Sequence, residues 1–196
     1  MNALNTFFGI CGEEFPKYLN AIKEDELYAA ADLICEAEKA GGRLHVTGIG
    51  KPAHVAGYVA SLISSTGTPA YFLHGTEAVH GSCGQLAAND VVICISNSGE
   101  TAELKATAIA ARNNGAKLIA VTGKPESWLA KFCEVHIFAG VEREGGPLAR
   151  APRMSVIAEC LALQALSVIL QERKQQTVEE YLMRHPGGTL GQSGNK

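Results

Sequence analysis

Five short apolar runs alternate with helical patterns along most of the chain. Each run is a nearly continuous series of Val, Ile, Leu and Ala, without a polar residue at every second position. Such runs are typical of parallel strands that are covered on both faces. We predict strands at residues 43–49, 69–74, 90–96, 117–122 and 135–139.

The segments beside these strands carry apolar residues at the helical spacing of three and four positions. We predict helices at residues 24–39, 53–65, 102–114 and 155–171. The alternation of strands and helices over residues 43–139 predicts an α/β fold. We expect a five-stranded parallel sheet in a doubly wound αβα sandwich, of the flavodoxin-like or Rossmann-like type.

Length and composition fit one folded unit. We expect residues 1–196 to form a single domain with a core at about residues 14–191, because no linker or repeat divides the chain. Hydrophobic residues make up 46% and charged residues 19%, which excludes a disordered chain. The net charge of −3 and the pI of 6.1 argue against nucleic acid as a partner.

The sequence predicts a cytoplasmic protein without a membrane partner. It has no uninterrupted apolar run of about 18 residues, and its first 20 residues do not resemble a signal peptide. None of the six cysteines forms a C-x-x-C pair. We therefore expect reduced thiols that serve as small apolar residues.

Polar, glycine-rich segments follow four of the predicted strands. In an open α/β sheet, ligands bind outside the carboxyl ends of the strands. We therefore expect these segments to share one pocket. They are residues 47–51, 74–81, 96–101 and 122–124.

Residues 96–101 form the sharpest local signal. Ser96, Ser98 and Thr101 carry hydroxyl groups around Gly99, between a buried strand and the start of a helix. Free N–H groups and the helix dipole at such a start favour an anion. An ordinary helix cap is the simpler alternative. Lys51, after a short glycine turn, adds a cation to the same sheet edge.

Six motifs in a fixed order carry a family resemblance. They are Gly48–Lys51, Ser65–Pro69, Glu77–Gly81, Ser96–Thr101, Thr122–Ser127 and His185–Gly191. The sequence resembles a sugar isomerase (SIS) domain, most closely the arabinose-5-phosphate isomerase branch. That branch interconverts D-arabinose 5-phosphate and D-ribulose 5-phosphate, towards the sugar Kdo of lipopolysaccharide or capsule.

The resemblance also implies further properties. It implies an enzyme without a cofactor or required metal, and a homotetramer whose active sites are shared between subunits. The chain stops soon after Gly191, so we expect it to lack the pair of CBS modules of longer relatives.

The resemblance implies two sets of site residues. The catalytic set is Lys51, Glu103, Glu144 and His185. The set for substrate and phosphate binding is Gly50, Ser96, Asn97, Ser98, Thr101, His80 and Arg153, with His80 as a contact for an inhibitory metal.

Aldose–ketose isomerisation moves a proton between C1 and C2 through an enediol, so it needs a base, an electrostatic stabiliser and an acid that opens the ring. Glu144 suits the shuttling base, and Lys51 suits stabilisation of the enediolate oxygen. His185 suits ring opening or proton relay. Glu103 either orients Lys51 or is itself the base, and the sequence leaves this open.

Each of these residues has a simpler explanation. Glu103 fits a solvated helix surface, Glu144 a charged loop and His185 a turn. His80 equally fits a loop hydrogen bond. We expect His45 and Phe72, which lie in predicted strands, to belong to the core.

The chain departs from the family pattern at three places. Pro52 and Ser82 replace the usual Ser and Asp, and residues 153–156 (Arg-Met-Ser-Val) replace a run of hydroxyl residues. Arg153 either contacts phosphate in their place or faces solvent. The exact sugar therefore stays open.

Three functions fit the sequence. The first is a pentose 5-phosphate isomerase, and the second is an isomerase of another sugar phosphate, such as a hexulose 6-phosphate. The third is a non-catalytic sugar-phosphate sensor. A sensor needs the residues at 96–101 but not all four catalytic residues, so their presence favours an enzyme.

Overall fold

A five-stranded parallel sheet organises the chain, in a computed structural model that describes residues 2–187. The last part of the sixth motif, residues 188–191, and the tail at 192–196 lie outside the described residues. The strand order is β2-β1-β3-β4-β5. The strands are β1 (Leu44–Gly48), β2 (Ala70–Phe72), β3 (Val91–Ile95), β4 (Lys117–Thr122) and β5 (Val135–Phe138). The predicted fold class is confirmed.

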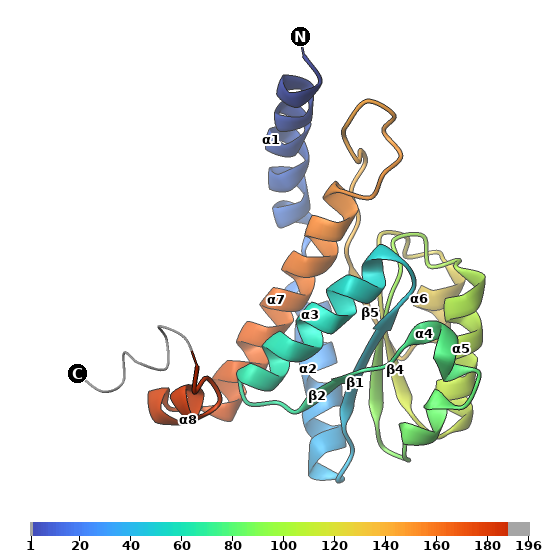
Figure 1. The fold of residues 1–196 in the computed structure, drawn as a ribbon, viewed down its shortest axis with the longest axis vertical. Coiled ribbons are helices and arrows are strands. Elements are labelled where there is room, and N and C mark those ends of the chain that lie inside the picture. Colours follow the sequence, from blue (N-terminus) through green and yellow to red (C-terminus); the bar gives the residue numbers. More distant parts are fainter. Residues whose placement is uncertain (1, 188–196) are drawn as a thin grey trace.

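Helices cover both faces of the sheet (Figure 1). One face packs against α2 (Glu24–Lys39), α3 (Lys51–Ser65) and α7 (Met154–Lys174). The other face packs against α4 (Gly75–Ala78), the 3-10 helix at Ser82–Gln85, α5 (Ala102–Asn113) and α6 (Trp128–Phe132). The remaining helices are α1 (Ala3–Ala21) and α8 (Val178–Met183).

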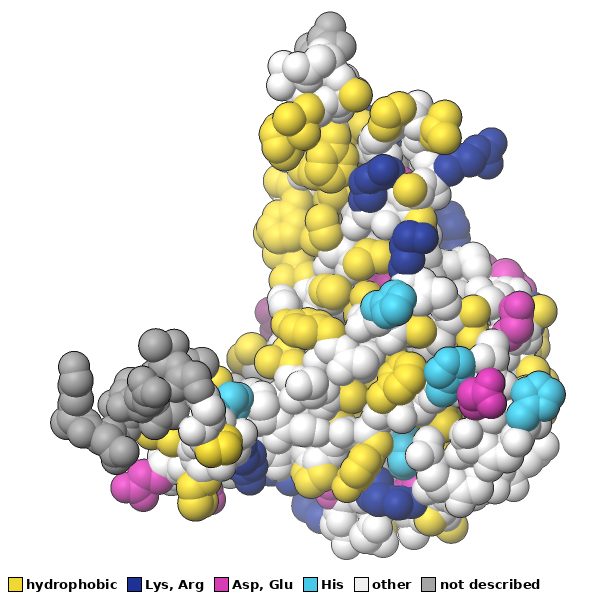
Figure 2. All heavy atoms as spheres, in the orientation of Figure 1, with side chains coloured by type: hydrophobic (Ala, Val, Ile, Leu, Met, Phe, Trp, Pro, Cys, Tyr) yellow, Lys and Arg dark blue, Asp and Glu magenta, His cyan; other side chains and the backbone are white. Residues whose placement is uncertain are grey.

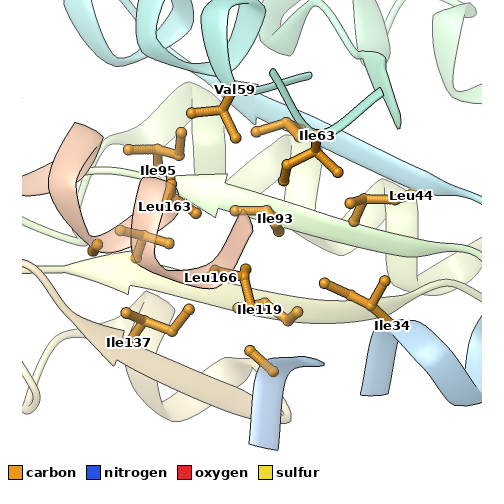
Figure 3. Packing of buried hydrophobic residues seen from close by; sticks show 14 of the residues in the cluster. Ile34, Leu44, Val59, Ile63, Ile93, Ile95, Ile119, Ile137, Leu163 and Leu166 are labelled. Carbon is orange, nitrogen blue, oxygen red and sulfur yellow. The ribbon is translucent and has the colours of Figure 1, made fainter. Parts of the chain in front are cut away.

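The larger core cluster lies between the sheet and the helices α2, α3 and α7. Its side chains interdigitate from the strands and the helices (Figure 3). The largest of its fully buried side chains are Ile34, Leu44, Ile63, Ile93, Ile95, Ile119 and Ile137. Strands β1, β3 and β4 are buried on both faces, which explains their continuous apolar sequences.

The edge strand β2 differs from its prediction. It has three residues, and Phe72 is 39% exposed. The expectation that Phe72 belongs to the core is wrong, because β2 has a neighbour on one side only. His45 in central strand β1 is 2% exposed, with Nε2 3.2 Å from Asp90 Oδ2, so its predicted core position is confirmed.

Helix α7 is long and apolar enough, by length and composition, to cross a membrane. Half of its most apolar window is buried inside the protein, where α7 packs on α2 and α3. The core helix of a folded domain can have the same length and composition, so these two properties are weak support for a membrane span. We interpret α7 as a core helix.

The strand order reverses direction between β1 and β3. The chain leaves β1 through α3 to reach β2 on one side, whereas β3, β4 and β5 follow on the other side. Gly48 at the end of β1 is in register with Ile95 at the end of β3. Ligands bind at such a switch point, outside the carboxyl ends of the strands.

Candidate active site

The loop after β3 is built tightly around Gly99. Gly99 has φ +65°, and a Cβ atom at this position would overlap the side chain of Ser127. Ser96 is buried; its Oγ accepts a hydrogen bond from Gly99 N (3.1 Å) and lies 3.2 Å from Thr101 Oγ1. The loop therefore holds its hydroxyl groups in one compact turn.

Thr101 is the N-cap residue of α5, but its side chain makes no capping hydrogen bond. Its hydroxyl faces Ser96 instead, and Ser98 Oγ accepts from Glu100 N at 3.2 Å. The first-turn N–H groups of α5 thus have no N-cap hydroxyl over them, which is the arrangement that suits an anion. Thr101 therefore occupies the N-cap position that the simpler alternative expects, but its hydroxyl does not cap the helix.

The turn after β1 places Lys51 at the same edge of the sheet. A Cβ atom on Gly48 would lie 2.8 Å from the carbonyl carbon of Pro52, so α3 can approach β1 closely only at a glycine. Gly50 has φ +68° and precedes Lys51, the first residue of α3. Lys51 is exposed and follows β1. Strand β1 is the neighbour of β3, and Ser96 follows β3.

Two hollows border this turn. One, of about 340 Å³, lies between α3 and α7 and is lined by Lys51, His54 and Pro152, among others. The second, of about 250 Å³, lies between Gly50 and the start of α4. The first hollow connects Lys51 with the segment that precedes α7.

Glu144 lies in this segment and is half-buried. Its Oε2 atom accepts hydrogen bonds from Arg153 N (2.6 Å) and Ser155 N (3.1 Å), at the amino end of α7. Arg153, the N-cap residue, makes no side-chain cap bond. Glu144 thus caps α7 from a distance, and among the described residues it does so through Oε2.

Arg153 has a specific position on its own loop. Its Nη1 donates to Gly145 O at 3.4 Å, and the guanidinium lies against Gly146.

The other predicted site residues lie on separate elements. Glu103 is exposed in the first turn of α5, and Asn97 accepts a hydrogen bond from Gly123 N through its backbone oxygen. His80 is exposed beyond α4. No group of three His, Cys, Asp or Glu side chains in residues 2–187 could hold a metal ion.

His185 lies apart from the other predicted catalytic residues in this chain. It follows α8, stacks on Tyr181 with the ring centroids 4.1 Å apart, and has Nδ1 2.8 Å from Tyr181 O. The segment before α8 packs at Gly67, at the carboxyl end of α3, whereas Lys51 begins α3. Figure 1 shows α8 at the far end of α3 and α7.

The sequence interpretation missed Glu159, on the inner face of α7. Its side chain is fully buried, and neither carboxyl oxygen has a hydrogen-bond partner within residues 2–187. Burial, and then the charge of Glu144, raise the pKa of Glu159 to about 8. The sequence did contain a signal for this buried residue, because Glu159 stands where the helical pattern of residues 155–171 places an apolar residue.

Comparisons with known proteins agree with this geometry. The sequence matches the SIS domain family over residues 38–169. The chain belongs to the SIS domain family. Helix α1 and residues after 169 lie outside the matched part of this SIS domain.

Individual relatives match a longer part of the chain than the family model does. The chain is 43% identical over 158 residues to arabinose 5-phosphate isomerase KdsD of Pseudomonas aeruginosa, and 41% identical over 150 residues to KdsD of Escherichia coli K12. These matches cover 80% and 76% of this chain, and 48% and 46% of the relatives, so the chain spans about half of their length. The solved structure of E. coli CFT073 c3406 in complex with arabinose 5-phosphate has a TM-score of 0.81 and 35% identity, and it covers 95% of this chain and 100% of that one.

Proposed function

We propose that this SIS domain is an aldose–ketose isomerase of phosphorylated sugars, most specifically of D-arabinose 5-phosphate and D-ribulose 5-phosphate. The observation that carries the proposal is the uncapped start of α5 beside Ser96 and Lys51, at the switch point of the sheet. Similarity to KdsD enzymes, and to a structure solved with arabinose 5-phosphate, favours the pentose phosphate.

The phosphate of the substrate binds at residues 96–101 in this proposal. The N–H groups that begin α5 and the hydroxyls of Ser96, Ser98 and Thr101 supply neutral donors. Asn97 and Gly50 line the approach, and Lys51 adds the cation. Arg153, whose guanidinium lies against residues 145–146, is a further proposed contact to the substrate.

Glu144 shuttles the proton between C1 and C2. Two backbone N–H groups hold its Oε2, so Oε1 is the oxygen that exchanges the proton. Lys51 stabilises the enediolate oxygen, and Glu103, on the first turn of α5, orients Lys51. His185 supplies the acid for ring opening. This scheme needs no cofactor or metal, and His80 is a sugar or inhibitory-metal contact.

An isomerase assay over a panel of pentose and hexose phosphates tests the proposal. We expect turnover of ribulose 5-phosphate, and a loss of about 100- to 10,000-fold in kcat for Glu144→Gln, which keeps an acceptor for the two N–H groups but cannot carry the proton. Glu172→Gln, at an exposed glutamate near the carboxyl end of α7, is the control. Binding of ribulose 5-phosphate without turnover of any sugar phosphate would support a sensor instead. Turnover of a hexulose phosphate alone would replace the substrate but keep the reaction.

We also propose self-association as a homotetramer with shared active sites. An exposed apolar stripe along α1, formed by Leu4, Phe8, Phe15 and Leu19, supports this assembly (Figure 2). His185 supports it as well. Helix α3 has 15 residues, so Lys51 and the attachment point of the α8 segment are roughly 20 Å apart at 1.5 Å per residue. A second copy of the chain then supplies His185 to the site.

We propose the cytoplasm as the location of the enzyme, and residues 1–196 as a single domain whose core is at about residues 14–191. A sugar phosphate carries a charge that is costly to transfer into a bilayer, so such substrates stay in the compartment that makes them.

A further inference from the structure

Helix α1 contributes a buried acid to the segment that carries Glu144. Glu14 has a side chain that is only 1% exposed. Its Oε2 accepts from Glu142 N, and its Oε1 accepts from Arg143 Nε, both at 2.9 Å. Burial acts to raise the pKa of Glu14, but the bonds from Arg143 and Glu142 N and the charge of Lys17 together lower it. Glu14 is thus an ionised group whose donors come mainly from the Glu144 segment.

A second contact from α1 lies on the other side of Glu144. Gly145 has φ +72°, and a Cβ atom there would lie 2.8 Å from the ring of Phe7. Phe7 therefore packs directly on the backbone of Gly145. Figure 1 shows α1 beside the loop that precedes α7. Contacts from α1 thus flank Glu144, at residues 142 and 143 before it and at residue 145 after it.

A third contact fixes α1 itself to the core. Tyr18 is buried, and its hydroxyl donates to Ala158 O at 3.0 Å, on the first turns of α7. The same hydroxyl lies 3.4 Å from Phe138 O, at the end of β5. Lys17 Nζ is 2.7 Å from Glu142 Oε2. Helix α1 is therefore held by both elements between which the Glu144 segment runs.

We propose that α1 holds the Glu144 segment in place and that Glu14 is the positioning residue for Glu144. Glu14 does not touch the substrate; it fixes Glu142 and Arg143, and so sets where the carboxyl group of Glu144 lies. The inference rests on the proposed role of Glu144 as the proton shuttle. A displacement of about 1 Å at a reacting group costs on the order of 100-fold in rate, so a remote anchor has a measurable effect.

The test compares Glu14→Gln with Glu13→Gln in the full chain. Glu13 also bonds to Arg143, but it is exposed and makes no bond to Glu142 N. In Glu14→Gln the amide keeps one acceptor and turns an NH2 group towards a donor. We expect kcat on ribulose 5-phosphate to fall about 10- to 100-fold with KM within about twofold. We expect Glu13→Gln to remain within about threefold of the wild type in both.

Two further measurements separate positioning from general damage to the fold. A substrate deuterated at the carbon that loses the proton should show a larger isotope effect on kcat in Glu14→Gln, because proton transfer becomes slower. Amide hydrogen exchange should become faster at residues 140–146 in Glu14→Gln but not in Glu13→Gln. A parallel loss of kcat and folded protein, with an unchanged isotope effect, would overturn the proposal.

The exchange measurement also keeps this proposal distinct from the proposed function. If the wild-type chain turned over no sugar phosphate, the isomerase proposal would fail. Faster exchange at residues 140–146 in Glu14→Gln alone would still support the anchoring role of α1, and equal exchange in the two variants would overturn it.

Discussion

Two buried glutamates have opposite environments, although both lie next to the segment that carries Glu144. Glu14 accepts bonds from a backbone N–H group and a guanidinium, so its pKa is lowered. Glu159 has no donor within the described residues, and burial raises its pKa to about 8. A buried carboxylate needs donors in order to stay ionised. Glu159 is therefore a neutral acid at neutral pH.

The stability of the protein should depend on pH through Glu159. Its pKa is about 8 in the folded protein and 4.5 ordinarily, so its contribution is fully present below pH 4.5 and is lost as pH rises to 8. The loss is roughly 1.4 kcal/mol per pH unit within this window. Glu159→Gln cannot titrate, so its free energy of unfolding should lack this slope.

Urea unfolding at pH 5, 6, 7 and 8 measures this effect. Glu172→Gln changes an exposed glutamate on the same helix and should follow the wild type. Parallel curves for the wild type and Glu159→Gln would contradict the prediction.

At the scale of the element, α7 depends on a residue that is not its own N-cap. Arg153 has no side-chain acceptor, so the carboxyl group of Glu144 satisfies the N–H groups of Arg153 and Ser155. One side chain thus combines a structural role with its proposed catalytic role. The two roles can be separated by supplying the cap locally.

Glu144→Ala should cost about 0.5–2 kcal/mol of stability, as the loss of a helix cap does. Adding Arg153→Ser to Glu144→Ala should recover most of this stability in thermal unfolding, because a serine at the N-cap position can cap the helix itself. The double variant should stay inactive in the isomerase assay, because the introduced serine supplies no base. Recovery of activity together with stability would show that Glu144 acts through the helix alone.

At the scale of the whole molecule, the proposed active site is incomplete in one chain. Lys51 begins α3, whereas α8, which precedes His185, lies at the other end of α3 and α7 (Figure 1). An assembly that brings His185 from a second copy would join them. The apolar stripe on α1 offers a surface for such an assembly.

Complementation between two inactive variants tests this arrangement. Glu144→Gln and His185→Asn should each be inactive alone. Coexpressed, they should restore about a quarter of the wild-type activity, since random assembly gives that share of sites an intact residue from each chain. A homotetramer should also be seen by size-exclusion chromatography with light scattering. No recovery of activity in mixed oligomers would mean that His185 does not act across subunits.

The sequence by itself determined the local features of this protein. Continuous apolar runs predicted four strands to within one residue at each end, because strands buried on both faces leave no polar position. Residues 96–101 were recognised because hydroxyl and glycine residues follow a strand within one turn. The length of the edge strand β2 was predicted less accurately, since this strand has a neighbouring strand on one side only.

Tertiary structure alone decided what the buried acids touch. Glu14 and Glu142 are 128 positions apart, and no periodicity connects them. The same holds for Glu144, whose role as the cap of α7 depends on how residues 145–152 fold back. Sequence patterns report the period of one element, whereas burial and ion pairing depend on contacts between distant elements. The separation of His185 from Lys51 is a fact of the same kind, because it follows from the direction in which α3 and α7 run.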